Sequence, residues 1–146
     1  MPSELTLADY RALADFRYQL RRFLHFSESA AREGGLEPQQ HQLLLAVKGA
    51  PGGQPPTIGM LAERLQLRHH STVELVDRME DRKLVRRARA GEDRRQVLVS
   101  LTDAGESLLA RLSAAHRAEL RSVGPRLVRA VGALVTEMED RRAANR

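Results

Sequence analysis

The stretch that decides the fold is "STVELVDRMEDRKLVRRARAGEDRRQVLVSLTDAG", which covers residues 71–105. Apolar residues recur at helical spacing in residues 71–82, and this pattern predicts a helix. Residues 84–90 and 96–101 alternate in polarity or are β-branched, and the "AGED" between them is rich in turn-forming residues. The stretch therefore predicts a helix followed by a short β-hairpin.

Ser71 is predicted to cap this helix, because Glu74 three residues later completes a capping box. Val73, Val76 and Met79 would then form the buried side of the helix.

Upstream, three more helices are predicted. The first runs from Thr6, which has Asp9 three residues later, to the glycine pair Gly34–Gly35. The second covers residues 38–48 and begins with a proline, which suits a first helical position. After the irregular loop "GAPGGQPP", Thr57 is predicted to cap a short third helix.

Downstream, Thr102 is predicted to cap a long helix with leucines on its inner side. Gly124–Pro125 is predicted to break this helix, so that a separate last helix follows. The chain is thus expected to be mostly α with a small β-hairpin wing, and residues 1–146 form a single domain. Two short helices, a turn and a hairpin within residues 38–101 make a winged helix-turn-helix.

The composition narrows the classes of function. The chain has 24 Lys and Arg against 19 Asp and Glu, a net charge of +5, and no cysteine. Disulfides, thiolate catalysis and cysteine-ligated zinc are therefore excluded. With three Phe, two Tyr and no Trp, a stacking platform for single-stranded nucleic acid is disfavoured. We see no signal peptide and no apolar run long enough for a membrane span, so we expect a cytoplasmic protein.

The hairpin carries most of the informative charge. Its two arms and tip hold five arginines and two acids, which are Arg86, Arg87, Arg89, Arg94, Arg95, Glu92 and Asp93. A hairpin beside a polar helix suits DNA, because the helix can enter the major groove while the arginines reach phosphates or the minor groove. Membrane binding would need bulky apolar side chains beside the cations, which this hairpin lacks.

The segments "LAERL", "STVELVDRMEDRKLVRR" and "GEDRRQVLVSLTDAG" together resemble the MarR family of bacterial transcriptional regulators, and the layout of the helices extends the resemblance over nearly the whole chain. The specific part is the wing pattern D-x-R…L-T-x-x-G, matched by Asp93, Arg95, Leu101, Thr102 and Gly105. Two departures are a glutamine at position 66, where the family often has a turn glycine, and a turn that is one residue longer.

The resemblance implies a homodimer that binds a roughly palindromic operator in double-stranded DNA, often as a repressor released by a small phenolic or lipophilic ligand. Residues 5–33 and 102–142 would hold the dimerisation helices. Packing agrees, because the small winged lobe cannot cover the apolar stripes of both terminal helices in a monomer.

The expected DNA contacts fall into three groups. The recognition helix and the residues just before it supply His69, His70, Ser71, Thr72, Glu74, Leu75 and Arg78. The wing supplies Arg94 and Arg95, and the family pattern has Asp93 orient Arg95. Phosphate contacts are expected from Arg64, Arg68, Arg86 and Arg87. Two roles stay open: Arg78 can contact guanine or phosphate, and Glu74 can read cytosine or act only in the capping box.

Two further sets of residues are expected to face a partner subunit or a ligand. The dimer interface would include Leu13, Leu127, Val131, Leu134 and Met138. A ligand pocket would be lined by Phe16, Leu20, Phe23, His41 and Leu45, which also suit an ordinary core, with Arg17 placed to pair with a carboxylate of the ligand.

The sequence shows no catalytic constellation, nucleotide loop or metal cage, so we expect no enzyme, no cofactor and no metal. The neighbouring His69 and His70 fit DNA backbone or turn packing better than metal ligation. Two other functions stay open, a winged-helix protein-interaction module and a non-specific DNA-binding protein.

Overall fold

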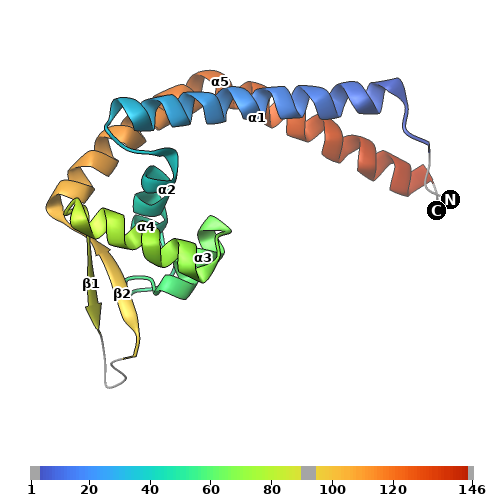
Figure 1. Ribbon diagram of the computed structural model, residues 1–146. Coiled ribbons are helices and arrows are strands. Elements are labelled where there is room, and N and C mark those ends of the chain that lie inside the picture. The colour runs from blue at the N-terminus through green and yellow to red at the C-terminus, as the bar shows by residue number, and fades with distance from the viewer. Residues whose placement is uncertain (1–3, 90–94, 145–146) are drawn as a thin grey trace. The chain divides into compact units, whose positions relative to one another are not determined.

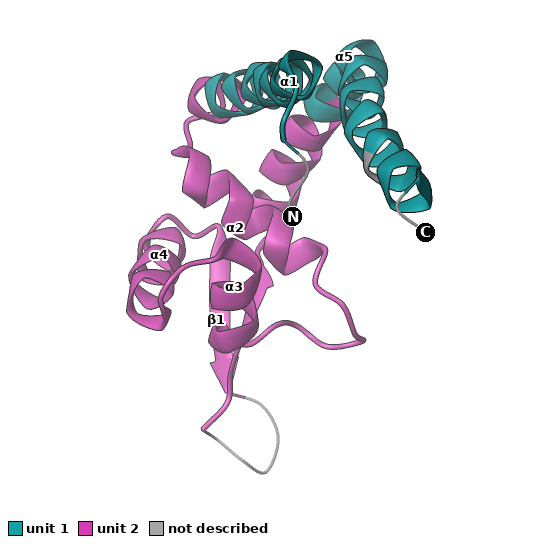
Figure 2. Ribbon diagram, turned by 90° about the vertical axis from the view of Figure 1, so that its right-hand side faces the viewer, with its two compact units in different colours: residues 1–29, 115–146 teal, residues 30–114 magenta. Residues whose placement is uncertain are grey.

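The computed structural model describes residues 4–89 and 95–144, without the side chain of Met138, and the chain divides into two compact units. Unit 1 holds residues 1–29 and 115–146, and unit 2 holds residues 30–114 (Figure 2). Two long helices, α1 (Leu7–Glu33) and α5 (Asp103–Ala144), each contribute to both units. We call unit 2 the winged lobe.

The winged lobe contains the three short helices and the hairpin (Figure 1). In chain order these are α2 (Pro38–Lys48), α3 (Ile58–Leu65), α4 (His69–Asp81), β1 (Val85–Arg89) and β2 (Val97–Leu101). The strands are antiparallel, in a register that runs from Val85 opposite Leu101 to Arg89 opposite Val97. The predicted fold class, mostly α with a hairpin wing, is confirmed.

One hydrophobic core holds the winged lobe together, and every helix and both strands contribute to it. Its buried residues are Ala31, Leu36, Leu43, Leu44, Val47, Ile58, Leu61, Leu75, Val76, Met79, Leu84, Val85, Val99, Leu108, Leu109 and Leu112. The ends of α1 and α5 that enter this core fix the long helices to the lobe at residues 31 and 108–112.

Side-chain caps begin α3 and α5 where the sequence predicts them. The Thr57 Oγ1 atom accepts a hydrogen bond from the Met60 N–H at 3.2 Å, and the Thr102 Oγ1 atom accepts one from the Gly105 N–H at 3.1 Å. A further capping box, which the sequence analysis did not identify, starts α2 at Glu37, whose N–H donates to Gln40 Oε1.

The hairpin also pairs with the segment before α3. The Val99 N–H donates to the Pro56 carbonyl at 2.9 Å, and Thr57 forms an antiparallel bridge with Leu98. A single bridged residue leaves no periodic pattern in a sequence, so this third partner of the sheet was not predicted. It attaches the start of α3 to the wing.

The backbones of Gly105 and Leu84 lie close together where α5 begins. A Cβ atom on Gly105 would overlap the Leu84 carbonyl oxygen. Thr102 stabilises the same junction, because its hydroxyl donates to the Lys83 carbonyl at 2.7 Å and its N–H to the Leu84 carbonyl at 3.1 Å. Only glycine fits at position 105, because a side chain would displace backbone rather than a flexible neighbour.

In unit 1, a histidine joins α1 to α5. The His116 Nε2 and Ser27 Oγ atoms lie 2.7 Å apart, and the rings of Phe23 and Phe26 meet the imidazole edge to face. Ser27 is buried, so this hydrogen bond satisfies a hydroxyl that water cannot reach.

A charged cluster joins the start of α1 to the end of α5. The buried Asp9 carboxylate accepts hydrogen bonds from the Thr6 N–H and hydroxyl and from the Arg141 guanidinium. The Arg141 guanidinium, followed by the two Thr6 donors, holds the pKa of Asp9 well below its usual value of 3.8. The capping box predicted at Thr6 is confirmed, and Arg141 is a partner that the sequence analysis did not identify.

The predicted break at Gly124–Pro125 is wrong, because α5 is one helix of 42 residues with Pro125 inside it. Proline lacks one N–H donor, but its fixed φ of about −65° is a helical value. The long helical run on both sides continues through this one missing bond.

Replacing Gly105 with alanine is expected to destabilise the protein by about 1–3 kcal/mol, because the new methyl group overlaps the backbone of Leu84. Urea denaturation measures the change. The matched control is Gly59→Ala in α3, where the new Cβ atom meets its nearest neighbour at an ordinary 3.8 Å. Equal stabilities for the two variants would contradict the close approach.

Replacing Asp9 with asparagine is expected to lower the melting temperature at neutral pH. Because folding lowers the pKa of Asp9, its carboxylate stabilises the fold at pH values above 3.8, and this contribution is lost as the pH falls through the lowered pKa. The difference from the wild type should therefore shrink in acid. Melting curves from pH 7 down to about pH 2, at one protein concentration, check this, and Glu28→Gln, at an exposed position of α1, is the control.

Candidate nucleic-acid interface

The turn between α3 and α4 is made by a glutamine in a left-handed conformation. Gln66 has φ 53° and ψ 43°, and its N–H bonds back to the Ala62 and Glu63 carbonyls. Its side-chain Nε2 also donates to the Glu63 carbonyl at 2.7 Å. The turn that a glycine often makes in the MarR family is thus kept, at a backbone cost of about 1–2 kcal/mol.

The predicted cap at Ser71 is wrong, because α4 begins two residues earlier, at His69. Leu67 packs half-buried against the core directly after the turn, so the helix starts immediately behind it. The Arg68 side chain makes no capping hydrogen bond. The Arg68 carbonyl accepts from both the N–H and the hydroxyl of Thr72.

Glu74 is therefore not engaged in a capping box. Its Oε1 atom lies 3.2 Å from His70 Nε2, one helical turn away, and both side chains are exposed. The carboxylate thus lies on the exposed surface of α4.

The exposed face of α4 differs from the predicted contact set in two residues. Thr72 is 0% exposed and Leu75 is 4% exposed, so both belong to the core and cannot contact DNA. Thr72 and Leu75 lie on the same side of α4 as Val76 and Met79, and this side is buried. The prediction had assigned these two positions to DNA. The predicted residues that the structure leaves exposed on this helix are His69, His70, Ser71, Glu74 and Arg78.

Beside this face, α3 and α4 border a hollow of about 530 Å³. It is lined by Gly59, Ala62, Glu63, Gln66, Leu67, Arg68 and His69. Arg68 and the nearby Arg64 are both exposed, as phosphate contacts require.

The hairpin presents exposed arginines on β1 and just before β2. Arg86 on β1 and Arg95 just before β2 are exposed. Asp93 and Arg94 lie outside the described residues, so the predicted orientation of Arg95 by Asp93 stays a prediction.

Arg87 was predicted to contact phosphate, but the structure pairs it with two carboxylates on α4. Its guanidinium lies 2.7 Å from Asp77 Oδ1 and 3.0 Å from Glu80 Oε1, and its backbone N–H donates to Glu80 Oε2 at 3.0 Å. The hydrogen bond to Glu80, with the charges of Glu80 and Asp77, raises the pKa of Arg87. The bond from Arg87 likewise lowers the pKa of Glu80. The prediction missed this because Asp77 and Glu80 come before the hairpin in the chain.

The predicted dimer residues belong to unit 1 and differ in their exposure to solvent. Leu13 and Val131 are exposed, and Leu127 and Leu134 are half-buried. The side chain of Met138 is outside the described residues. Other large apolar side chains of this unit are also exposed, namely Leu5, Leu7, Tyr10, Tyr18, Leu24, Leu120, Val128 and Val135.

The predicted ligand-pocket residues are divided between the units. Phe16, Arg17, Leu20 and Phe23 belong to unit 1, where Phe23 contacts His116. His41 and Leu45 belong to the winged lobe, where His41 is buried and Leu45 is exposed. The pocket formed by all six stays a prediction.

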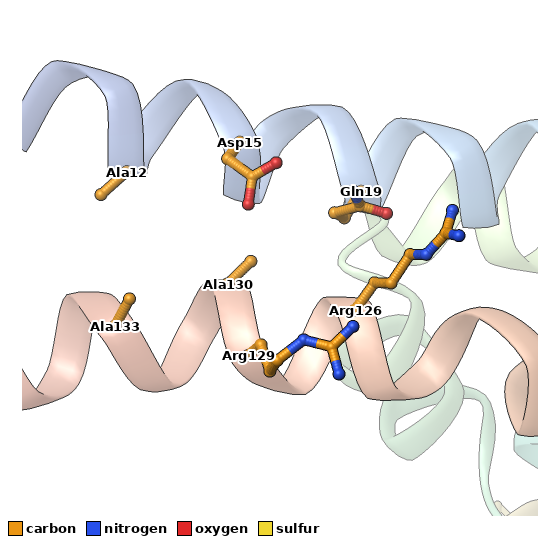
Figure 3. A pocket seen from close by; sticks show the side chains of 7 residues that line it. All are labelled: Ala12, Asp15, Gln19, Arg126, Arg129, Ala130 and Ala133. Atoms are coloured by element: carbon orange, nitrogen blue, oxygen red, sulfur yellow. The ribbon is translucent and has the colours of Figure 1, made fainter.

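A different hollow, of about 290 Å³, lies within unit 1 between α1 and α5 (Figure 3). Asp15 and Gln19 of α1 face Arg126, Arg129 and small alanines of α5 across it. None of the predicted pocket residues lines this hollow.

Within residues 4–89 and 95–144, no group of three or more His, Asp or Glu side chains could hold a metal ion. In the same part of the chain, no helix combines the length and the apolar character needed to cross a bilayer.

The chain matches one family model and many solved structures. The model described as the MarR family matches residues 34–96, from the end of α1 into the hairpin. AbsC, a MarR family transcriptional regulator from Streptomyces coelicolor, superimposes with a TM-score of 0.72 at 20% identity and covers 94% of this chain and 98% of its own.

MepR, a transcription regulator of the Staphylococcus aureus multidrug efflux pump MepA, gives a TM-score of 0.69 at 16% identity, over 93% of this chain and 98% of its own. A MepR–DNA complex gives 0.67 at 16% identity, over 98% and 100%. No curated protein matches the sequence significantly.

At these identities the solved structures show a shared fold. The family model adds a match in sequence across α2, α3, α4 and β1. The chain therefore matches the MarR family model over residues 34–96 and shares the fold of MarR family transcriptional regulators.

Proposed function

We propose that the protein is a sequence-specific, double-stranded-DNA-binding transcriptional regulator that works as a homodimer, as a repressor released by a small ligand. One observation carries the proposal: the polar exposed face of α4 stands beside a hairpin with exposed arginines in the same compact unit. The similarity to the regulator structures supports it.

The exposed residues of α4 have the chemistry that base reading needs. Ser71, Glu74 and Arg78 recur at spacings of three and four residues, so they lie on one side of the helix. An α-helix is about 10–12 Å across, which matches the major groove of about 12 Å. Arg78 can bind guanine through two hydrogen bonds, and Glu74 can accept one from cytosine.

The hairpin arginines supply the part of the affinity that does not depend on sequence. Arg86 and Arg95 are exposed guanidiniums next to the reading helix, and a minor groove or phosphate backbone attracts such groups. Gln66 keeps the tight turn before α4, so the departure from the family glycine gives no reason to prefer a protein-interaction module.

The dimer rests on the apolar surface of unit 1. Val128, Val131 and Val135 are exposed on α5 at the spacing of one helix face, and Val128 is 71% exposed. A second copy would cover this face and bring two α4 helices to half-sites about 34–36 Å apart, one turn of DNA. Covering exposed apolar area is the main stabilising contribution in such interfaces.

A ligand that binds one arrangement of the dimer better than the other would shift its affinity for DNA. The family resemblance supports a small phenolic or lipophilic ligand, and the residues proposed to line its site are those predicted from the sequence, on α1 and α2. Titration of a panel of small phenols into the protein–DNA complex tests this part of the proposal.

Replacing Arg95 with alanine is expected to weaken binding to the operator tenfold or more, about 1.4 kcal/mol, with little change in thermal stability. Fluorescence anisotropy at about 150 mM salt measures this on a duplex from the DNA upstream of the protein's own coding region, against a scrambled duplex. The wild type should prefer the first duplex by about 10³-fold or more.

The control is Arg111→Ala, which removes the same charge from the exposed side of α5. Equal losses for both variants would mean that only net charge matters. Equal, weak and salt-sensitive binding of the wild type to both duplexes would contradict specific recognition of this operator.

Replacing Val131 with aspartate is expected to dissociate the dimer, because a charge would be buried in an apolar contact. Sedimentation velocity over a dilution series should show a dimer for the wild type and a weaker dimer, by 100-fold or more, for the variant. Thr136→Asp is the control, since Thr136 is exposed on α5 away from the valine face. A monomeric wild type at micromolar concentration would refute the dimer.

A further inference from the structure

We infer that Arg87 is a positioning residue, which fixes the rotation of α4 against the wing and so aligns the two DNA-reading parts. The expected effect on DNA binding rests on the proposed function. The ion pairs of Arg87 are observed in the structure and do not depend on that function.

Arg87 lies on the side of the hairpin that faces α4. Side chains alternate along a strand, so Arg87 shares a face with the buried Val85, while Arg86 points to the opposite face. The Arg87 side chain is 31% exposed, and its two guanidinium nitrogens reach different carboxylates, Asp77 and Glu80.

The two carboxylates come from one flank of α4. Asp77 and Glu80 are three residues apart, so they are neighbours on the helix surface. Two ion pairs from neighbouring positions hold this flank of α4 against Arg87, so they resist rotation of the helix about its axis more than one pair would. Arg78 follows Asp77 by one residue and is therefore turned about 100° around the helix, onto the exposed face.

Glu80 is held on the strand by the backbone as well as by the side chain. One carboxylate oxygen accepts from the Arg87 N–H and the other from the Arg87 guanidinium, both at 3.0 Å. The backbone bond fixes the carboxylate to the edge of β1 and not only to a flexible side chain. A backbone donor at an open strand edge is satisfied in the same step.

The charge balance argues against a phosphate contact by Arg87. One guanidinium faces two carboxylates, so the three side chains together carry a net charge of −1. A DNA phosphate would have to displace both carboxylates and approach a negative cluster. A lysine could not replace this arginine, because it lacks the planar fork that reaches two acceptors.

The first test needs no DNA. Amide hydrogen exchange, followed by NMR on the full chain, is compared between the wild type, Arg87→Met and Glu80→Ala. We expect the Arg87 amide or its neighbours in β1 to exchange tenfold faster or more in both variants, while the core amides of α4 stay protected. The control is Arg86→Met, which changes the next residue on the opposite face and should leave β1 unchanged.

The second test uses the two duplexes described above. Arg87→Met, Arg87→Lys and Glu80→Gln are expected to weaken binding to the operator tenfold or more and to lower the preference for it over the scrambled duplex. Arg86→Met should weaken binding to both duplexes alike and reduce the salt slope by about 0.9, as loss of one phosphate contact does.

The outcomes distinguish the positioning role of Arg87 from the proposed function of the protein. Unchanged amide exchange in Arg87→Met overturns the inference that Arg87 holds α4 against β1, whatever the result of the DNA-binding measurements. Tighter DNA binding by Glu80→Gln overturns the positioning role, because the guanidinium released from its carboxylate would then be contacting phosphate. An unchanged preference for the operator in Arg87→Met overturns it as well, because reading of the operator would then not depend on Arg87. Faster exchange together with a wild type that prefers no duplex refutes the proposed function, and with it any role of Arg87 in reading DNA.

Discussion

The close approach of Gly105 to the Leu84 carbonyl is the constraint on which the winged lobe depends. At this point α4 has just ended, the hairpin begins, and α5 starts. Thr102 closes the junction by capping α5 and donating to the Lys83 carbonyl. Because a backbone oxygen occupies the space of a Cβ atom, the spacing between hairpin and helix is fixed by the backbone rather than by adjustable side chains.

Around this junction, similar arginines have different surroundings and therefore different uses. Arg86 and Arg87 are neighbours in the chain, yet alternation places one on the open face of β1 and the other against α4. A guanidinium held between two carboxylates, as in Arg87, fixes the position of the segments that it joins. An exposed guanidinium, as in Arg86, is accessible to a polyanion. Net charge alone, +5 over the chain, does not distinguish these uses.

The two units obey different physical demands. The winged lobe buries its apolar residues within one core and leaves polar groups on the exposed face of α4. Unit 1 pairs α1 with α5 through a few polar contacts, at Asp9–Arg141 and Ser27–His116, and keeps many apolar side chains exposed. A unit with such a surface is suited to association with a second copy.

The sequence by itself determined what depends on local pattern. Helical spacing, the threonine caps and the strand alternation predicted α1, α2, α3, the start of α5, the hairpin and the fold class, since these interactions span three or four residues. The tertiary structure decided the rest. It placed Thr72 and Leu75 in the core, started α4 at His69, carried α5 through Pro125 and gave Arg87 its acidic partners. Each of these depends on which distant segment packs against the residue, and such packing leaves no periodic trace along the chain.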